Sequence, residues 1–96
     1  MERQPCVYIL TNKKNGTLYV GVTSNLPKRI WQHKNKFIEG FSKRYNLDRL
    51  VWYENHEDML SALAREKAIK YWKRQWKLEV INNFNPEWKD LYKEIF

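Results

Sequence analysis

Two segments rich in β-branched and aromatic residues flank an Asn-Gly turn near the start of the chain. Residues 4–11 read QPCVYILT, residues 17–22 read TLYVGV, and Asn15-Gly16 lies in the turn cluster between them. β-Branched and aromatic residues favour strands, and Asn-Gly pairs adopt the positive φ angles of tight hairpin turns. The pattern predicts a β-hairpin over residues 5–22, so we expect the chain to build an antiparallel sheet from its first residues.

The length and the cysteine content limit what can surround this hairpin. The 96 residues fit one domain and exclude a (β/α)8 barrel, which needs roughly 250 residues. A single cysteine, Cys6, excludes an internal disulfide and a cysteine-rich zinc site, and His33 and His56 are too few for a histidine metal site. A metal would therefore need oxygen ligands. The lone cysteine and the absence of a signal-like or membrane-length apolar segment predict a cytoplasmic location.

The rest of the chain predicts helices and one more strand. Asn25 and Pro27 mark the start of a helix of about residues 26–38, with Leu26, Ile30 and Phe37 on one stripe. Residues 40–46 are expected to form a basic aromatic loop, and residues 49–55 (RLVWYEN) a strand.

The C-terminal half predicts a long helix and then a short one. Asp58 is expected to cap a helix that runs to about residue 75, and residues 78–83 predict the short helix. The spacing predicts that the long helix buries an apolar stripe of Leu60, Leu63, Ala64, Ala68, Tyr71 and Trp72. The order β-β-α-β-α-α predicts an α+β fold, a small three-stranded antiparallel sheet flanked by helices.

Positive charge is concentrated in two stretches. The chain has 18 Lys and Arg against 11 Asp and Glu, and residues 3–38 contain seven bases and no acid. Residues 59–78 contain six more bases and a single acid, Glu66. Clustered bases attract polyanions, so nucleic acid is the expected partner. The alternative is a solvated basic surface.

Three features have residue types suited to chemistry. Tyr8 and Tyr19 lie on the two predicted hairpin strands, where the right register would bring them to one face, and Gly21 indicates a bulge or a close approach of another backbone or ligand. Arg29 and His33 are spaced i, i+4 on the predicted helix, and both can bind phosphate. The alternatives are ordinary strand packing and a solvated helix face.

Glu66 is the third feature. It lies beside the predicted apolar stripe of a helix whose other charged residues in this region are basic. It could pair with Lys70, or it could hold a hard cation whose other ligands are phosphate and water.

Taken in order, these residues resemble the GIY-YIG nuclease family. The likeness rests on Val7-Tyr8-Ile9, Tyr19-Val20-Gly21, residues 26–33 (LPKRIWQH) and residues 64–70 (AREKAIK), and it extends from residue 6 to about 91. The chain is most similar to the small single-domain bacterial members, which are related to the N-terminal domain of the excision-repair nuclease and to homing endonuclease catalytic domains. The resemblance implies one nuclease domain over residues 1–96. It also implies a metal-dependent endonuclease that cuts phosphodiester bonds in DNA, and a place in DNA repair.

The resemblance also implies a role for each site residue. Tyr8 and Tyr19 would lie on the attacking side, one of them as the base that activates water. Arg29 would stabilise the charge that develops on the phosphoryl oxygens, and His33 would hydrogen-bond the phosphate or a tyrosine. Glu66 would hold one divalent cation, expected to be Mg²⁺ with Mn²⁺ as an alternative.

The chain departs from the family pattern at a few positions. Cys6 replaces the first glycine of the family motif, and Val22 stands where several members have a lysine that assists catalysis. Lys43 is a candidate replacement for that lysine. The family's late asparagine has three candidates, Asn82, Asn83 and Asn85, of which we favour Asn85.

A second hypothesis is a nucleic-acid-binding module that does not cut. It would bind structured or single-stranded DNA or RNA, with exposed aromatic residues as stacking platforms. Trp31, Phe41, Tyr45 and Trp72 are candidates, although periodicity places Trp31 and Trp72 in the core. A third hypothesis is a domain whose protein partner supplies target specificity.

Overall fold

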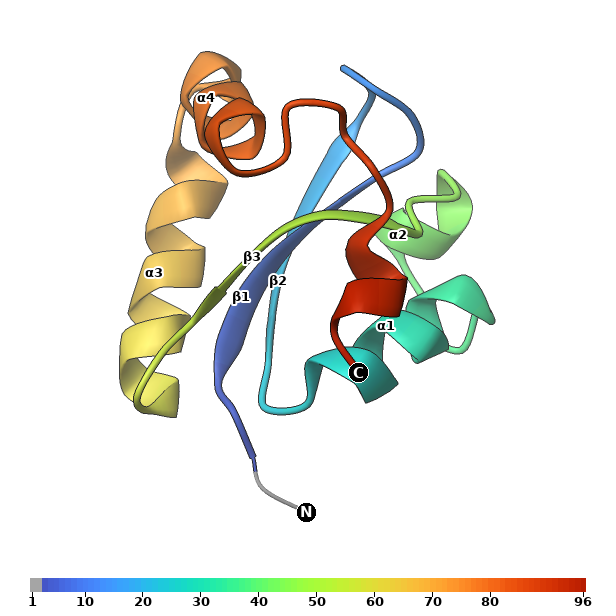
Figure 1. Cartoon of the computed structure of the whole chain (residues 1–96). Helices are drawn as coiled ribbons and strands as arrows, with labels where there is room; N and C mark the ends of the chain where they lie inside the picture. The colour runs from blue at the N-terminus through green and yellow to red at the C-terminus, as the bar shows by residue number, and fades with distance from the viewer. Residues whose placement is uncertain (1–2) are drawn as a thin grey trace.

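The computed structural model describes residues 3–96 as a three-stranded antiparallel sheet with helices on both faces (Figure 1). The strands are β1 (Cys6–Thr11), β2 (Leu18–Thr23) and β3 (Arg49–Asn55), in the spatial order β2-β1-β3. The helices are α1 (Leu26–Lys34), α2 (Phe41–Arg44), α3 (Met59–Tyr71), α4 (Arg74–Phe84) and the 3₁₀ helix η1 (Leu91–Glu94). The α+β class and the hairpin predicted from the sequence are confirmed.

β1 is the central strand, and both of its faces are covered. All six of its residues are buried. Val7 and Ile9 belong to the core under α3 and α4, whereas Tyr8 and Leu10 belong to the core under α1 and η1. Successive strand residues point to opposite faces, so two cores meet at this one strand. Figure 1 shows α3 and α4 on one side of the sheet and α1, α2 and η1 on the other.

The first helix is shorter than the sequence predicts. α1 ends at Lys34, and Lys36 has a φ of 62°, a left-handed conformation that ends helical hydrogen bonding. The chain turns away there, so Phe37 is 68% exposed and does not lie on the predicted stripe with Leu26 and Ile30. The predicted loop over residues 40–46 contains the single-turn helix α2.

The predicted apolar stripe of α3 is wrong. Leu60 and Tyr71 are more than four-fifths exposed (81% and 82%), and the buried positions are Ala62 and Ile69. Ala62 and Ile69 belong to the core against the sheet, and this rotation of the helix turns Leu60 outward. The helix also ends earlier than predicted, because Trp72 adopts an extended backbone (φ −64°, ψ 151°), and α4 begins at Arg74.

None of the helices in the part of the chain that the structure describes is long and apolar enough to cross a membrane.

Candidate active site

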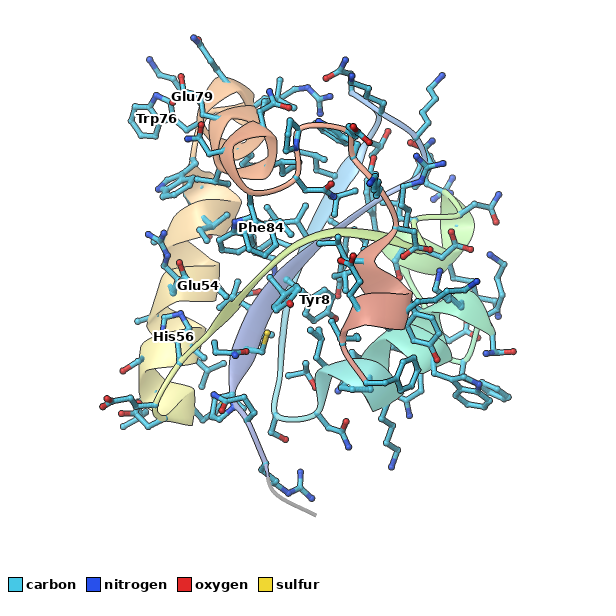
Figure 2. The ribbon with its side chains drawn as sticks, in the orientation of Figure 1. Tyr8, Glu54, His56, Trp76, Glu79 and Phe84 are labelled. Carbon is cyan, nitrogen blue, oxygen red and sulfur yellow. The ribbon has the colours of Figure 1, made fainter. Side chains whose placement is uncertain are left out.

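Tyr8 and Tyr19 lie on the same face of the hairpin. β1 and β2 pair so that Tyr8 lies opposite Gly21 and Leu10 lies opposite Tyr19. This register brings the two tyrosine rings to a centroid distance of 6.3 Å. The side of the sheet that they share faces α1, and Figure 2 shows Tyr8 on it, away from Glu54 and His56 beside α3.

His33 joins the two tyrosines from α1. Its ring centroid lies 5.7 Å from that of Tyr8 and 5.5 Å from that of Tyr19, both in edge-to-face geometry. The Tyr8 hydroxyl and His33 Nε2 form a hydrogen bond of 2.8 Å. Tyr8 is 1% exposed and His33 is 3% exposed, so this bond is shielded from water.

Gly21 makes room for this cluster. A Cβ at this position would overlap Cζ and Oη of Tyr8 and would lie 2.9 Å from Cε1. The Tyr8 ring therefore lies across the backbone of β2 at a point where no side chain is tolerated. The sequence signal of a glycine within a strand indicated a close approach, and the group that approaches is the Tyr8 ring.

Burial sets the protonation of Tyr8 and His33. It raises the pKa of the Tyr8 phenol above its usual range, so the hydroxyl keeps its proton at neutral pH. Burial, assisted by the positive charge of Arg29, lowers the pKa of His33 to about 4. The pair is therefore uncharged at neutral pH, and one hydrogen bond joins its two groups.

Ser42 is a member of this cluster that the sequence analysis missed. Its Oγ lies 3.0 Å from His33 Nδ1, and its side chain is buried. Both ring nitrogens of His33 thus have a partner, which fixes the plane of the ring. Nothing in the local sequence pointed to Ser42, because it lies nine positions after His33 in a segment predicted to be a loop.

Arg29 lies one turn before His33 on α1. Its positive charge lowers the pKa of both Tyr8 and His33, so its guanidinium lies within electrostatic range of the tyrosine cluster. Among residues 3–96, no carboxylate forms an ion pair with Arg29. The guanidinium is therefore available to an anionic ligand.

Glu66 lies on the opposite side of the sheet from α1. It lies on α3, which packs against β1 and the edge strand β2, and its side chain is only 15% exposed. Its negative charge contributes to the raised pKa of Tyr8, so Glu66 lies within electrostatic range of the tyrosine cluster.

Glu66 pairs with Lys70, which is one of the two alternatives that the sequence predicts for it. The distance from Lys70 Nζ to Glu66 Oε2 is 3.0 Å, and the hydrogen bond with Glu66 is the main cause of the raised pKa of Lys70. The other carboxylate oxygen, Oε1, has no hydrogen bond to a described residue. The ion pair with Lys70 therefore leaves Oε1 available to bind another ligand.

The donor set fits a cation that takes most of its ligands from substrate and water. Residues 3–96 contain no cluster of three or more His, Cys, Asp or Glu side chains that could hold a metal ion. One mostly buried carboxylate with a free oxygen matches the way Mg²⁺ binds through one or two carboxylates and substrate phosphates.

No contact among the described residues links Lys43 or Asn85 to Tyr8 or Tyr19. Lys43 pairs with Glu39 at 2.8 Å. Asn85 is buried at the end of α4, where its side chain bonds only backbone groups: Nδ2 donates to the carbonyls of Val51 and Lys89, and Oδ1 accepts from the Lys89 amide.

Cys6 and Val22, which depart from the family pattern, pack against the two cores. Cys6 is buried beside Tyr8 in the core under α1, and burial raises the pKa of its thiol to about 11, so it stays protonated. Val22 packs against the opposite core.

The expectation that Trp31 lies in the core is wrong. It is 47% exposed and stacks on Phe37 with a centroid distance of 5.4 Å, because α1 turns this position outward. Trp72 is partly buried against the core under α3, as periodicity predicted.

Comparisons with known proteins agree with this geometry. The sequence model described as the GIY-YIG catalytic domain matches residues 4–79. A UPF0213 protein of Clostridium perfringens is 36% identical over 89 residues, which cover 93% of this chain and 95% of that protein. A UPF0213 protein of Autographa californica nuclear polyhedrosis virus is 64% identical over 74 residues, 71% of this chain and 70% of that protein.

One solved structure has the same fold. The solution NMR structure of a UPF0213 protein from Bacillus halodurans superposes with a TM-score of 0.57 at 23% identity, and it covers 94% of this chain and 95% of that one. Because the family model matches residues 4–79, which is most of the chain, the chain belongs to the GIY-YIG catalytic domain family.

Proposed function

We propose that this protein is a metal-dependent endonuclease that hydrolyses phosphodiester bonds in DNA. The observation that carries the proposal is the hydrogen-bonded Tyr8–His33 pair, with Tyr19 packed against both rings. Membership of a nuclease family and the unpaired Arg29 support it. A structural core alone gives no reason to keep two hydroxyls and an imidazole together beside an unpaired guanidinium.

Arg29 and Glu66 supply the electrostatics of the proposed reaction. The Arg29 guanidinium binds the scissile phosphate and stabilises the negative charge that builds on its oxygens. Glu66 would hold a divalent cation, which would supply Lewis acidity to the phosphate. Mg²⁺ is the favoured ion, with Mn²⁺ as the alternative.

Tyr19 is the proposed base. Tyr8 is fully buried, bonded to His33 and held in its protonated form, so it cannot serve as the base and instead holds the His33 ring in place. Tyr19 is only partly buried and lies on the edge strand β2, where water can reach it. A positioned general base contributes roughly 10²–10⁴-fold to the rate.

The test is cutting of supercoiled plasmid, branched DNA and single-stranded oligonucleotides in Mg²⁺, in Mn²⁺ and in EDTA. Glu66→Gln and Tyr19→Phe should each lose at least about 100-fold in rate while thermal melting stays near the wild type. Glu79→Gln is the matched carboxylate control, because Glu79 is exposed on the outer side of α4 (Figure 2). Tyr71→Phe is the tyrosine control, because Tyr71 is 82% exposed.

Cutting that persists in EDTA would contradict the metal requirement, and equal losses in Glu66→Gln and Glu79→Gln would contradict the assigned site. If no substrate is cut but DNA binds tightly, the second candidate function holds, a binding module. The exposed pairs Trp31–Phe37 and Phe41–Tyr45 favour that candidate, because each presents an aromatic face to solvent.

A further inference from the structure

A hollow of about 750 Å³ opens where β2 ends and α1 begins. Three of the residues that line it carry positive charge, Arg3, Lys28 and Arg29, and the other described lining residues have uncharged side chains. Arg29 also belongs to the tyrosine cluster, because its charge acts on both Tyr8 and His33. Arg29, which lines the hollow, therefore also acts on the proposed active site.

Arg3 is held at this place by contacts far apart in sequence. Its Nη1 donates to Ser24 Oγ at 2.9 Å, and the neighbouring Gln4 amide donates to the Ser24 carbonyl at 3.0 Å. The start of the described chain thus lies against the β2–α1 turn, as Figure 1 shows. An arginine has five N–H donors, so most of those on Arg3 remain for a ligand.

The three cations of the hollow have no ion-pair partner, unlike five other bases of the described chain. Five Lys or Arg side chains elsewhere pair with carboxylates: Lys34, Lys43, Arg65, Lys70 and Lys89. No carboxylate of residues 3–96 pairs with Arg3, Lys28 or Arg29. Like charges that share a hollow repel one another, and an anion relieves that repulsion.

We propose that this hollow binds a phosphate of the substrate strand next to the phosphate that is cut. Lys28 and Arg3 bind that neighbouring phosphate, and Arg29 stands between it and the scissile one. The hollow is within the size range of ligand sites, about 300–1,000 Å³, and is wide enough for a nucleotide. The inference rests on the proposed function, since it extends the site along the same strand.

The experiment measures DNA binding as a function of salt, in EDTA, where the proposed reaction cannot occur. The dissociation constant of a fluorescein-labelled DNA duplex is followed by anisotropy over a range of KCl for the wild type, Lys28→Gln and Arg3→Gln. Each lost phosphate contact should reduce the slope of log K against log[salt] by roughly 1 and weaken binding at low salt. Circular dichroism melting checks that each variant is folded.

Lys14→Gln is the matched control. Lys14 is exposed in the hairpin turn, at the far end of the six-residue strand β2 and so roughly 20 Å from the hollow. The slope of log K against log[salt] for Lys14→Gln should equal that of the wild type. If Lys14→Gln reduces the slope as much as Lys28→Gln does, binding is spread over the basic surface and the hollow is not a site; if no form of the protein binds the duplex, the proposal is also overturned.

The results separate this inference from the proposed nuclease. Reduced slopes for Lys28→Gln and Arg3→Gln without any cutting by the wild type would support the phosphate site and contradict the nuclease. Cutting by the wild type with unchanged slopes would support the nuclease and overturn the phosphate site. If both hold, Lys28→Gln should raise KM and leave kcat near the wild-type value.

Discussion

Gly21→Ala is expected to disrupt the site and the fold together. Gly21 lies opposite Tyr8 in the hairpin, and an added methyl group would overlap the end of the Tyr8 ring. The ring cannot move away freely, because Tyr8 is 1% exposed and bonded to His33 at 2.8 Å. The substitution must shift the ring, the β2 backbone or both.

The magnitude follows from three contributions. Overpacking of a filled core costs about 1–3 kcal/mol. Loss of the Tyr8–His33 hydrogen bond adds about 0.5–1.5 kcal/mol, and the reduced entropy of the unfolded chain returns about 0.4–1 kcal/mol. We expect the free energy of unfolding to fall by about 1–3 kcal/mol, and the melting temperature of a domain of this size to fall by about 4–8 °C per kcal/mol.

The assay is urea unfolding of a double-mutant cycle with Tyr8→Leu. In the Tyr8→Leu background the ring is absent, so adding Gly21→Ala should cost little or should stabilise the protein slightly. The coupling between the two substitutions should therefore be at least about 1 kcal/mol. If Gly21→Ala costs the same in both backgrounds, the ring contact is not the reason that position 21 requires glycine.

Three further predictions concern the buried polar groups. The pKa of His33 is about 4 in the folded protein and about 6.5 in the unfolded chain, so its contribution to stability is complete above pH 6.5 and falls by about 3 kcal/mol as the pH falls toward 4. Between pH 7 and pH 4.5, urea unfolding should show a larger decrease in the free energy of unfolding for the wild type than for His33→Gln. Equal decreases in the two proteins would contradict the neutral histidine. Ser42→Ala removes the partner of His33 Nδ1 and should cost about 1–2 kcal/mol in the same assay, whereas Ser42→Thr, which keeps the hydroxyl, should recover part of that loss. Asn85→Ala leaves the Val51 carbonyl and both backbone groups of Lys89 without this partner and should lower the unfolding free energy by about 1–3 kcal/mol; a change below 0.5 kcal/mol would show that the amide does not hold these segments together.

The hairpin and the third strand could be predicted because their signals are local. The strand over residues 49–55 has the bounds that the sequence predicts, and the hairpin strands differ by one or two residues. Each depends on β-branched and aromatic residues next to turn residues. The candidate site residues Tyr8, Tyr19, Arg29, His33 and Glu66 were predicted from their order and spacing through the resemblance to the family, and their roles stay predictions.

The long helix shows where such reasoning fails. Periodicity selected the most hydrophobic face of α3, with Leu60 and Tyr71, and that face is exposed. The sheet instead contacts Ala62 and Ile69, since the rotation of a helix is set by its tertiary packing and not by hydrophobicity alone. The same rotation turns Glu66 partly inward, so its side chain is 15% exposed.

The sequence by itself determined the α+β class, the hairpin, the basic surface and the set of residue types suited to phosphate chemistry, since each follows from neighbouring residues or from composition. Tertiary structure decided which of those residues meet and how they are protonated. The Tyr8–His33–Ser42 chain joins β1, α1 and α2, and the hollow beside Arg29 forms only where Arg3 returns to the β2–α1 turn. Burial raises the pKa of Tyr8 and lowers that of His33, and burial is a property of the packed chain as a whole.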